Sequence, residues 1–396
     1  MLARIKRIFR EPKVAVNELP SRMFYEKCVE ASMALANKGY DAESGKLLAF
    51  FPRVKMNPFQ HMLYASGYEN GFACFEAKES AEMVEAPEGL KVIAHYHWVS
   101  RVFQGVKTKR NAVKACNHFL EQVRQQKEAG HTLVWTVHNI LSHGSKFPDE
   151  EASLRAQMAE IMDHIHVMNP DTAALCTPYY QLPGKKIFHV PHPSYYGVYG
   201  DYISRIEARH MLGFLPDEKV FLLFGNMMQQ KGGARFIAEL DKLQSGLNGK
   251  ARVVVAGKSF DKDYTAKVQA MIKDRADVQL HPGYLDDQKV QVYFRAADVV
   301  VCPYAITLNS GVAMTAVSFG RPVVVPDSLR AVFADVGAQV VHYAIDDMDD
   351  CIEACLRAVT IGEIADTEAV LTNWAQLMAP RRVSGQFFEA LRSRVL

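Results

Sequence analysis

Two segments in the C-terminal half of this 396-residue chain place glycines, small polar residues and a lysine directly after apolar runs. The first is 224–233 (FGNMMQQKGG) and the second is 303–313 (PYAITLNSGVA). Glycines let the backbone approach a ligand, and amides at a helix N-terminus favour anions. Lys231 adds a charge suited to a phosphate, and Asn309 or Ser310 suits the N-cap of the next helix. As a pair the segments predict a diphosphate site, although each alone reads equally well as a capped helix with turn glycines.

A second group of candidates consists of histidines and acids in the N-terminal half. His138 ends an apolar run and suits a general base or a hydrogen-bonding partner of a sugar, with a structural histidine as the alternative. His95 and His97 share one face of another run, so they are candidates for acceptor contact, with a structural role as the stronger alternative. Asp149 and Glu150 could supply the carboxylate base of an inverting enzyme, but acids at a helix start usually only favour the helix dipole.

Other motifs are absent from the chain or are interpreted as structural. The first segment matches neither GxGxxG nor GxxxxGK[ST], which disfavours a plain dinucleotide site and a Walker loop. No cluster of His, Cys and acidic residues has the spacing of a zinc site, so we expect no metal. The remaining histidines near strands are interpreted as structural: His164, His166, His189 and His192.

The elements that position the glycine segments are clearest in the C-terminal half. Short β-branched runs bounded by Gly or Pro predict buried strands at 220–224, 252–256, 278–280, 298–302 and 321–325. Amphipathic stretches predict helices at 234–244, 263–274, 286–296 and 313–319. This alternation predicts βαβ units and a doubly wound parallel sheet, in which ligands bind at the carboxyl ends of the strands. Both glycine segments stand at such ends.

The N-terminal half repeats the alternation less clearly. Its predicted strands are 92–96, 133–137, 165–168 and 187–190, and its predicted helices are 24–38, 110–129 and 150–163, with an extra edge strand at 13–16. A Pro-, Gly- and Tyr-rich stretch at 191–201 marks the junction. We therefore expect an N-terminal domain of residues 1–192, in which 1–45 are an uncertain extension, and a C-terminal domain of residues 193–379. A last helix in 380–396 is expected to cross back to the first domain.

Composition excludes several classes of protein. Lys and Arg total 46 against 44 acidic residues, a net charge of +2, whereas a nucleic-acid binder usually concentrates far more positive charge. No apolar run approaches the ~18 residues that a bilayer span needs. Seven scattered cysteines are typical of reduced, mostly buried thiols in a cytoplasmic protein. The basic start, Met1 to Lys13, could lie on an anionic membrane surface, with an ordinary terminal helix or a frayed end as the alternative.

Further motifs follow the first glycine segment in a fixed order. They are Val255-Ala256-Gly257-Lys258, Gly283-Tyr284-Leu285, Ala297-Asp298-Val299-Val300-Val301 and Ser318-Phe319-Gly320-Arg321-Pro322-Val323-Val324. With them, 219–327 resembles the donor domain of GT-B glycosyltransferases, in particular family four (glycosyl transferases group 1) and related bacterial exopolysaccharide and lipopolysaccharide transferases. The resemblance implies an α/β fold of the GT-B kind, with two Rossmann-like doubly wound parallel-sheet domains facing a cleft. It also implies the donor-binding residues Gly225, Asn226, Lys231, Gly232, Gly257, Lys258, Tyr284, Leu285, Tyr304, Asn309, Ser310, Gly311 and Val312.

The N-terminal half adds weaker likenesses. The segment 57–60 (NPFQ) resembles the Asn-Pro-Tyr segment of bacterial polysaccharide transferases, and His138-Asn139 stands where family four has a His-Asn or His-Asp pair. The acceptor-binding residues implied are Asn57, Gln60, His95, His97 and Asn139. Catalytic candidates are His138, Asp149 and Glu150.

Two departures from the family pattern concern the phosphate site. Met228 stands where many relatives have an arginine, and 307–315 has no glutamate where many have a spaced pair. Lys231 and backbone amides are therefore the expected phosphate ligands. Tyr284 and Leu285 suit a base pocket, although Tyr284 also reads as a turn aromatic.

The resemblance implies hexosyl transfer from a UDP- or GDP-sugar to a carbohydrate or polyprenyl-linked acceptor in bacterial surface polysaccharide biosynthesis. No metal or cofactor is expected, and the protein is expected in the cytoplasm, with peripheral contact at the inner membrane face. The alternatives are a non-catalytic GT-B relative that acts as a scaffold, and a GT-B epimerase or phosphorylase.

Overall fold

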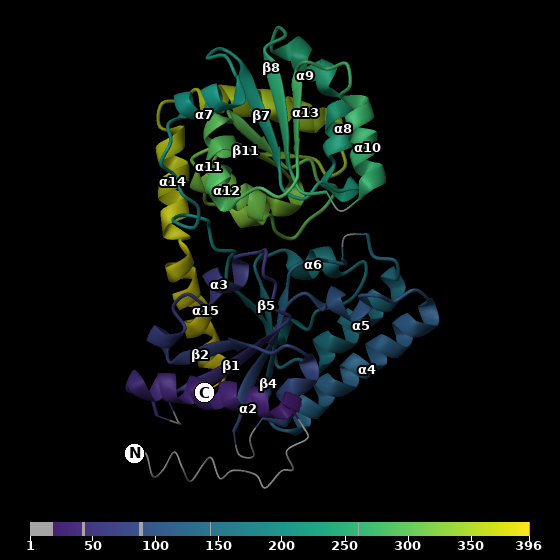
Figure 1. Ribbon diagram of the computed structural model, residues 1–396, viewed down its shortest axis with the longest axis vertical. Helices are drawn as coiled ribbons and strands as arrows, with labels where there is room; N and C mark the ends of the chain where they lie inside the picture. Colours follow the sequence, from purple (N-terminus) through teal and green to yellow (C-terminus); the bar gives the residue numbers. More distant parts are fainter. Residues whose placement is uncertain (1–18, 42–43, 87–89, 143, 260, 396) are drawn as a thin grey trace. The chain divides into compact units, whose positions relative to one another are not determined.

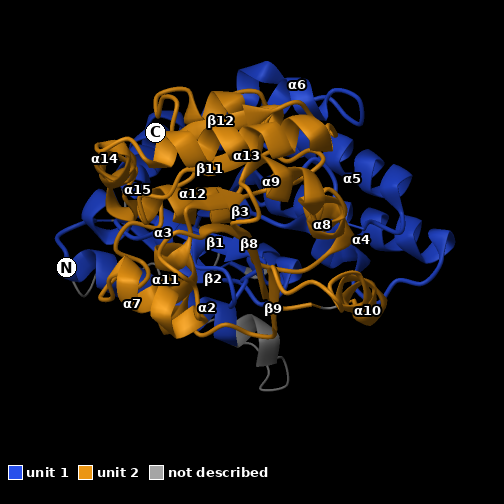
Figure 2. Cartoon of the chain, turned by 90° about the horizontal axis from the view of Figure 1, so that it is seen from above, with its two compact units in different colours: residues 1–168, 172–190, 383–396 blue, residues 169–171, 191–382 orange. Residues whose placement is uncertain are grey.

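A computed structural model describes the chain except for residues 1–18, 42–43, 87–89, 143, 260 and 396 (Figure 1). The basic start and the candidate edge strand at 13–16 lie outside the described residues. The chain folds into two compact units (Figure 2). Unit 1 comprises 1–168, 172–190 and 383–396, and unit 2 comprises 169–171 and 191–382. The last helix, α15 (Pro380–Val395), thus begins in unit 2 and has most of its length in unit 1.

Unit 1 is built on a six-stranded parallel sheet in the order β2-β1-β3-β4-β5-β6. Its strands are β1 (Lys46–Phe51), β2 (Phe72–Glu76), β3 (Val92–Tyr96), β4 (Thr132–Val137), β5 (His164–Val167) and β6 (Ile187–His189). Its helices, besides the end of α15, are α2 (Leu19–Asn37), α3 (Phe59–Leu63), α4 (Lys109–Glu128), α5 (Pro148–Ile161) and α6 (Thr172–Cys176). Single 3-10 turns lie at Tyr68–Asn70, Ser80–Glu85, Val99–Phe103 and Gly184–Lys186.

Unit 2 repeats the architecture with the strand order β12-β11-β10-β7-β8-β9, again all parallel. Its strands are β7 (Lys219–Phe224), β8 (Ala251–Gly257), β9 (Val278–Pro282), β10 (Val299–Val301), β11 (Val323–Pro326) and β12 (Val340–Tyr343). Its helices are α7 (Arg205–Leu212), α8 (Gly233–Ala238), α9 (Leu240–Gly246), α10 (Lys262–Met271), α11 (Asp287–Ala296), α12 (Gly311–Ser318), α13 (Met348–Gly362) and α14 (Thr367–Leu377). The 3-10 turns are Gln229–Lys231 and Asp327–Phe333.

The nine predicted strands are all present, within a few residues of their predicted bounds. Most of them are apolar runs buried on both faces, whereas the edge strands β6 and β9 are partly exposed. The predictions missed three strands, β1, β2 and β12. The single helix predicted at 234–244 is wrong. Glu239 leaves the helical region (φ −99°, ψ 9°) and separates α8 from α9.

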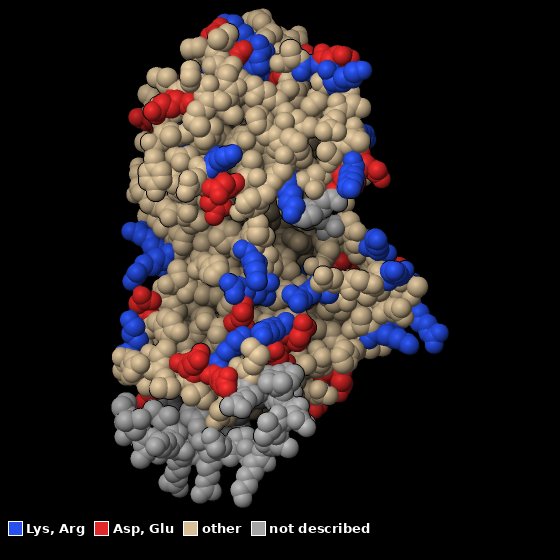
Figure 3. All heavy atoms as spheres, viewed as in Figure 1, with Lys and Arg blue, Asp and Glu red and all other residues tan. Residues whose placement is uncertain are grey.

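The seven cysteines are all free, and six of them are buried, as predicted. No helix in the described part of the chain is long and apolar enough to cross a membrane. On the face of the molecule in Figure 3, Lys and Arg are interspersed with Asp and Glu, in keeping with the near balance of charge in the sequence.

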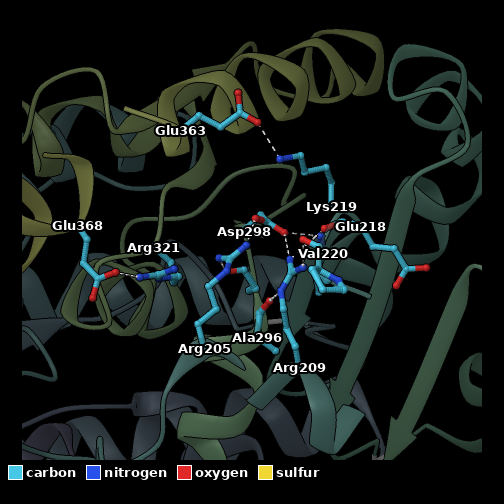
Figure 4. Close-up of polar contacts among 12 residues, drawn as sticks. Arg205, Arg209, Glu218, Lys219, Val220, Ala296, Asp298, Arg321, Glu363 and Glu368 are labelled. Atoms are coloured by element: carbon cyan, nitrogen blue, oxygen red, sulfur yellow. Dashed lines mark hydrogen bonds and ion pairs between the residues drawn. The ribbon is translucent and has the colours of Figure 1, made fainter. Parts of the chain in front are cut away.

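A partly buried carboxylate joins the amino ends of β7 and β10 in unit 2. Asp298 precedes β10, and one of its carboxylate oxygens accepts a hydrogen bond from the Val220 amide at 2.7 Å. Arg205 and Arg209 of α7 both pair with the same carboxylate (Figure 4). Since the strands are parallel, this cluster lies at the edge of the sheet opposite the glycine segments, so the Ala297-Asp298 motif is structural. Burial lowers the pKa of the Arg209 guanidinium, an effect that Asp298 opposes.

Candidate functional site

The loops after three neighbouring strands of unit 2 are hydrogen-bonded to one another. The amide of Gly225 donates to the Ala256 carbonyl at 2.9 Å, and the amide of Met227 donates to the Lys258 carbonyl at 2.8 Å. The amide of Gly283, after β9, donates to the Gly257 carbonyl at 3.0 Å. A Cβ atom on Gly257 would lie 1.8 Å from the Gly225 carbonyl oxygen, so only glycine fits there. These three loops form one hydrogen-bonded rim at the carboxyl edge of the sheet, which is called the rim below.

The two glycine segments, 70 residues apart in sequence, meet at this rim. A Cβ atom on Gly232 would lie 1.8 Å from the carbonyl oxygen of Pro303. A Cβ atom on Gly225 would lie 3.4 Å from Cγ2 of Val312. The ammonium nitrogen of Lys231 lies 3.9 Å from the centre of the Tyr304 ring. The two segments that the sequence paired as anion sites are therefore in direct contact.

Lys231 is a half-buried cation without a carboxylate partner among the described residues. Burial lowers the pKa of its amine, because the charged form loses hydration. The aromatic face of Tyr304 compensates part of that loss. Beneath the first loop lies a cavity of about 30 Å³, lined by Met227, Met228, Lys231, Tyr264 and Tyr304 among others.

The second segment caps helix α12 as predicted. Ser310 is the N-cap, and its hydroxyl accepts a hydrogen bond from the Ala313 amide at 3.2 Å. Tyr195 was not among the predicted residues, and its hydroxyl lies 2.8 Å from where a Cβ on Gly311 would stand. The Tyr195 amide donates to Ser318 Oγ at 2.9 Å, and its ring stacks on Tyr199 with centroids 5.5 Å apart. An aromatic pair therefore flanks the N-terminus of α12.

The other predicted donor-binding residues differ widely in exposure. Tyr284 is 61% exposed, Asn226 and Lys258 are exposed, and Leu285 is partly exposed. Tyr304 is buried, and its carbonyl accepts a hydrogen bond from the Tyr343 hydroxyl at 2.7 Å. Asn309 is partly exposed, and its carbonyl accepts a hydrogen bond from Thr307 Oγ1 at 2.8 Å.

Unit 1 gathers its candidate histidines into one hydrogen-bonded network. His138 Nε2 lies 3.0 Å from His97 Nδ1, and His97 Nε2 lies 2.7 Å from the hydroxyl of Tyr64. The same hydroxyl lies 2.7 Å from His95 Nδ1. Burial lowers the pKa of His95 and of His97 well below the usual value, and the neighbouring histidines add to the effect. Both rings are therefore neutral at physiological pH.

The network continues beyond the predicted residues. His95 Nε2 lies 2.7 Å from Thr136 Oγ1, which lies 2.9 Å from His166 Nδ1. The remaining nitrogen of His166, Nε2, lies 2.9 Å from the carbonyl oxygen of Val190. His166 was interpreted from the sequence as structural, and Thr136 and Tyr64 were not among the predicted residues. The signal available was polar alternation in adjacent strands, but linking the strands required their pairing register.

The predicted acceptor-binding residues outside this network serve local structure. Asn57 Oδ1 accepts a hydrogen bond from the Phe59 amide at 2.9 Å. Gln60 is buried, and its amide group bonds the Val54 amide and the Pro52 carbonyl at 2.9 and 2.8 Å. The carbonyl of Asn139 accepts from Arg155 Nη1 at 2.9 Å. The contacts of Asn57 and Gln60 use side-chain groups, whereas the contact of Asn139 uses only its backbone carbonyl.

The two candidate carboxylates lie in the first turn of α5. Asp149 is exposed, and Glu150 forms an ion pair with Lys109 at 3.0 Å. That lysine lowers the pKa of the Glu150 carboxyl, which disfavours a general base there. Among the described residues, no group of three or more His, Cys, Asp or Glu is placed to hold a metal ion.

Comparisons with known proteins bear on the family and the fold of this chain. Residues 218–360 match the family model described as glycosyl transferases group 1. The resemblance to group 1 glycosyltransferases is thereby confirmed. An uncharacterized glycosyltransferase of Methanocaldococcus jannaschii is 28% identical over 141 residues, which are 36% of this chain and 35% of the relative. The aligned region thus spans about a third of that relative.

Solved structures similar to this chain are glycosyltransferases of the GT-B fold. Anabaena HepE, in complex with UDP and glucose, superposes with a TM-score of 0.65 at 14% identity, covering 88% of this chain and 100% of HepE. Sucrose-phosphate synthase from Thermosynechococcus elongatus has a TM-score of 0.59 at 13% identity, covering 88% and 98%. WaaG, a glycosyltransferase involved in lipopolysaccharide biosynthesis, has a TM-score of 0.52 at 13% identity, covering 87% and 99%. The chain therefore has the GT-B fold.

Both departures from the family pattern, Met228 and the stretch 307–315 without glutamate, lie within residues 218–360. Met228, where an arginine is common, is partly exposed and lines the cavity beneath the first loop. Thr307, in the stretch without glutamate, is buried, and its amide donates to Ser328 Oγ at 3.2 Å. Lys231 is consequently the cation that stands at the meeting point of the two segments.

Proposed function

We propose that this chain transfers a hexosyl group from a nucleoside-diphosphate sugar to a hydroxyl acceptor, without a metal ion. The observation that carries the proposal is the contact of the two glycine segments around a half-buried lysine that lacks a carboxylate partner among the described residues. HepE, which shares the fold, binds UDP and glucose. A diphosphate is the ligand that best matches two backbone cradles and one cation.

The same groups suit the departure of the nucleotide. When the sugar–phosphate bond breaks, negative charge develops on the leaving diphosphate. Donors that already point at that position stabilise it at no cost in reorganisation. The Lys231 amine is held by Tyr304, and α12 is held by the Ser310 cap, so both are preorganised. An anion beside Lys231 would also reverse the effect of burial on its pKa.

On this proposal the N-terminal unit binds the acceptor, with His138 as the base or hydrogen-bonding partner. The similarity to WaaG supports a carbohydrate or polyprenyl-linked acceptor in bacterial surface polysaccharide synthesis. A reaction at the cytoplasmic face of the inner membrane would fit such an acceptor. UDP and GDP are the nucleotides to be tested first.

Calorimetry with UDP and GDP tests the donor site. We expect one of them to bind, and Lys231→Met to weaken that binding roughly 10- to 150-fold, the value of one charge-assisted hydrogen bond. Lys242→Met is the matched control, because this exposed lysine of α9 pairs with Asp349 and Glu239 away from the rim. If neither nucleotide binds, or if both variants bind like the parent, the donor site is wrongly assigned.

A scaffold without catalysis is the second candidate. The observation in its favour is the absence of the arginine and the glutamates that many group 1 enzymes use, at Met228 and along 307–315. The two candidates differ in turnover: a transferase hydrolyses or transfers its bound donor sugar, whereas a scaffold leaves the donor intact. Release of UDP or GDP from a panel of labelled nucleotide sugars decides between them.

A further inference from the structure

A buried ion pair of α5 in unit 1 joins that helix to the loop after β4. Glu151 and Arg155 stand one helical turn apart, and their side chains are only 1% and 4% exposed. Arg155 Nε and Nη2 donate to Glu151 Oε1 at 3.0 and 2.7 Å. The guanidinium lies over the ring of Trp135 in β4, 5.9 Å from its centre. Glu151 directly follows the two acids that the sequence made candidates, Asp149 and Glu150.

Both members of the pair hold the loop that follows His138. Arg155 Nη1 donates to the Asn139 carbonyl at 2.9 Å. The amide and the hydroxyl of Ser142 both donate to Glu151 Oε1, at 2.9 and 2.7 Å. Hydrogen bonds to an ionised partner are stronger than those between neutral groups. The loop is therefore fixed at residues 139 and 142 by three such bonds.

The Glu151 carboxyl stays ionised although it is buried. Burial raises its pKa, but Arg155 and then Ser142 lower it by more, so the pKa lies below the usual value. A buried ion pair usually adds little to stability, because the loss of hydration offsets the attraction between the charges. An apolar pair of similar volume could pack here as well, but it could not bond the loop at residues 139 and 142. Stability alone therefore does not account for these two charges.

The anchored loop presents the side chain of Asn139. This residue is partly exposed, and its side-chain amide forms no hydrogen bond with the described residues. An amide group can both donate to and accept from a sugar hydroxyl. Since Asn139 directly follows His138, its amide lies next to the base or hydrogen-bonding partner of the proposed reaction.

Resting on the function proposed above, we propose that Glu151 and Arg155 are positioning residues, which hold Asn139 so that its side-chain amide contacts the acceptor beside His138. The pair fixes the backbone of the loop, and Asn139 makes the contact. A loop that is ordered before the acceptor arrives loses little further conformational freedom on binding. Loss of the anchor should therefore lower the rate of transfer more than the stability of the fold.

Ser142→Ala tests the anchor without disturbing the buried pair, because Arg155 keeps its carboxylate. We expect amide hydrogen exchange at position 142 to become about tenfold faster or more, the value of one charge-assisted hydrogen bond. The kcat/KM for the acceptor should fall by a similar factor, and Ser142→Thr, which keeps the hydroxyl, should restore both. Ser153→Ala is the matched control, because Ser153 lies on the exposed face of α5 and contacts only Gln157.

A double-mutant cycle shows whether the anchor acts through Asn139. Asn139→Ala should lower the kcat/KM for the acceptor, and Ser142→Ala added to it should lower it no further, because the positioned group is gone. Glu151→Met combined with Arg155→Leu removes the pair without leaving a lone buried charge. Its urea midpoint should stay close to that of the parent, while transfer falls at least tenfold and the nucleotide affinity of unit 2 is unchanged.

Three results would overturn the positioning role. They are additive losses in the cycle, a Ser142→Ala variant with the exchange and transfer of the parent, and losses of transfer that only follow the losses of stability. A parent that transfers no sugar from any donor would refute the proposed function and the inference that rests on it. A parent that turns over, with variants that turn over equally well, would refute the positioning role alone.

Discussion

Gly232→Ala should damage the rim of unit 2 far more than the same substitution at a comparable glycine. Gly232 has φ +70° and stands between Lys231 and α8. Its missing side chain is what allows the two glycine segments to touch, since an added Cβ would lie 1.8 Å from the Pro303 carbonyl oxygen. Real Cβ atoms do not approach an oxygen closer than 3.0 Å, so the segments must separate by more than 1 Å.

The loss of stability in Gly232→Ala has two parts, which a control variant can separate. Alanine in the left-handed region costs ~1–2 kcal/mol whatever its surroundings. Forcing the two backbone segments apart adds ~1–3 kcal/mol, the usual cost of overpacking. Gly249 shares the conformation, with φ +78°, but a Cβ there meets nothing within 4 Å. Gly249→Ala should therefore cost the first part alone.

Urea unfolding and nucleotide calorimetry of the two variants complete the comparison. We expect Gly232→Ala to be less stable than Gly249→Ala by ~1–3 kcal/mol and to bind the nucleotide at least tenfold more weakly. Gly249→Ala should bind like the parent. Equal losses of stability in the two variants, with unchanged affinity in both, would mean that contact between the two segments does not organise the site.

Three further changes test other parts of the structure. Asp298→Ala leaves Arg209 buried without its carboxylate and should lower the free energy of unfolding in urea by ~3–5 kcal/mol. The exposed Asp217, which pairs with Lys250, is the control, and Asp217→Ala should have little effect. Similar losses in the two variants would show that the cluster in Figure 4 is dispensable. Burial lowers the pKa of His192 to about 4, below its ordinary value of 6.5. The free energy of unfolding should therefore fall by ~3 kcal/mol as the pH drops from 6.5 to 4, because the unfolded state takes up a proton first. His192→Gln should lose that part of the acid sensitivity, whereas the exposed His210→Gln should keep it. Ser310→Ala removes the cap of α12 and should lower both the free energy of unfolding, by ~1 kcal/mol, and the nucleotide affinity. Ser204 is the cap of α7, and Ser204→Ala should lower the stability alone.

The sequence predicts the fold of unit 2 well because its strands are short apolar runs ended by glycine or proline. Apolar runs that are buried on both faces are typical of a parallel sheet covered by helices. The right-handed crossover rule then limits how consecutive strands can be connected in that sheet. Among the missed strands, β1 is an apolar run between Gly45 and Pro52, so the same signal was present there. The other two missed strands have weaker signals. β12, for example, carries His342 between apolar residues and has no glycine at its end, and β2 carries Cys74 and Glu76.

The candidate donor site was predictable as two segments, but not as one contact. Strand order explains this difference. β7 and β10 are neighbours in the sheet although two other strands, β8 and β9, separate them in sequence. That adjacency brings the loop after Phe224 to the loop after Cys302. Only the pairing register shows that Gly232 lies against Pro303.

The histidine network shows why single residues are a poor unit for predicting function from sequence. His95, Thr136 and His166 each look like satisfied core residues, and each of them is one. Their connection depends on the pairing of β4 with β5, which sets Thr136 opposite His166 and within hydrogen-bonding distance of it. Which buried polar residues are joined to a candidate such as His138 can therefore be known only from the folded sheet.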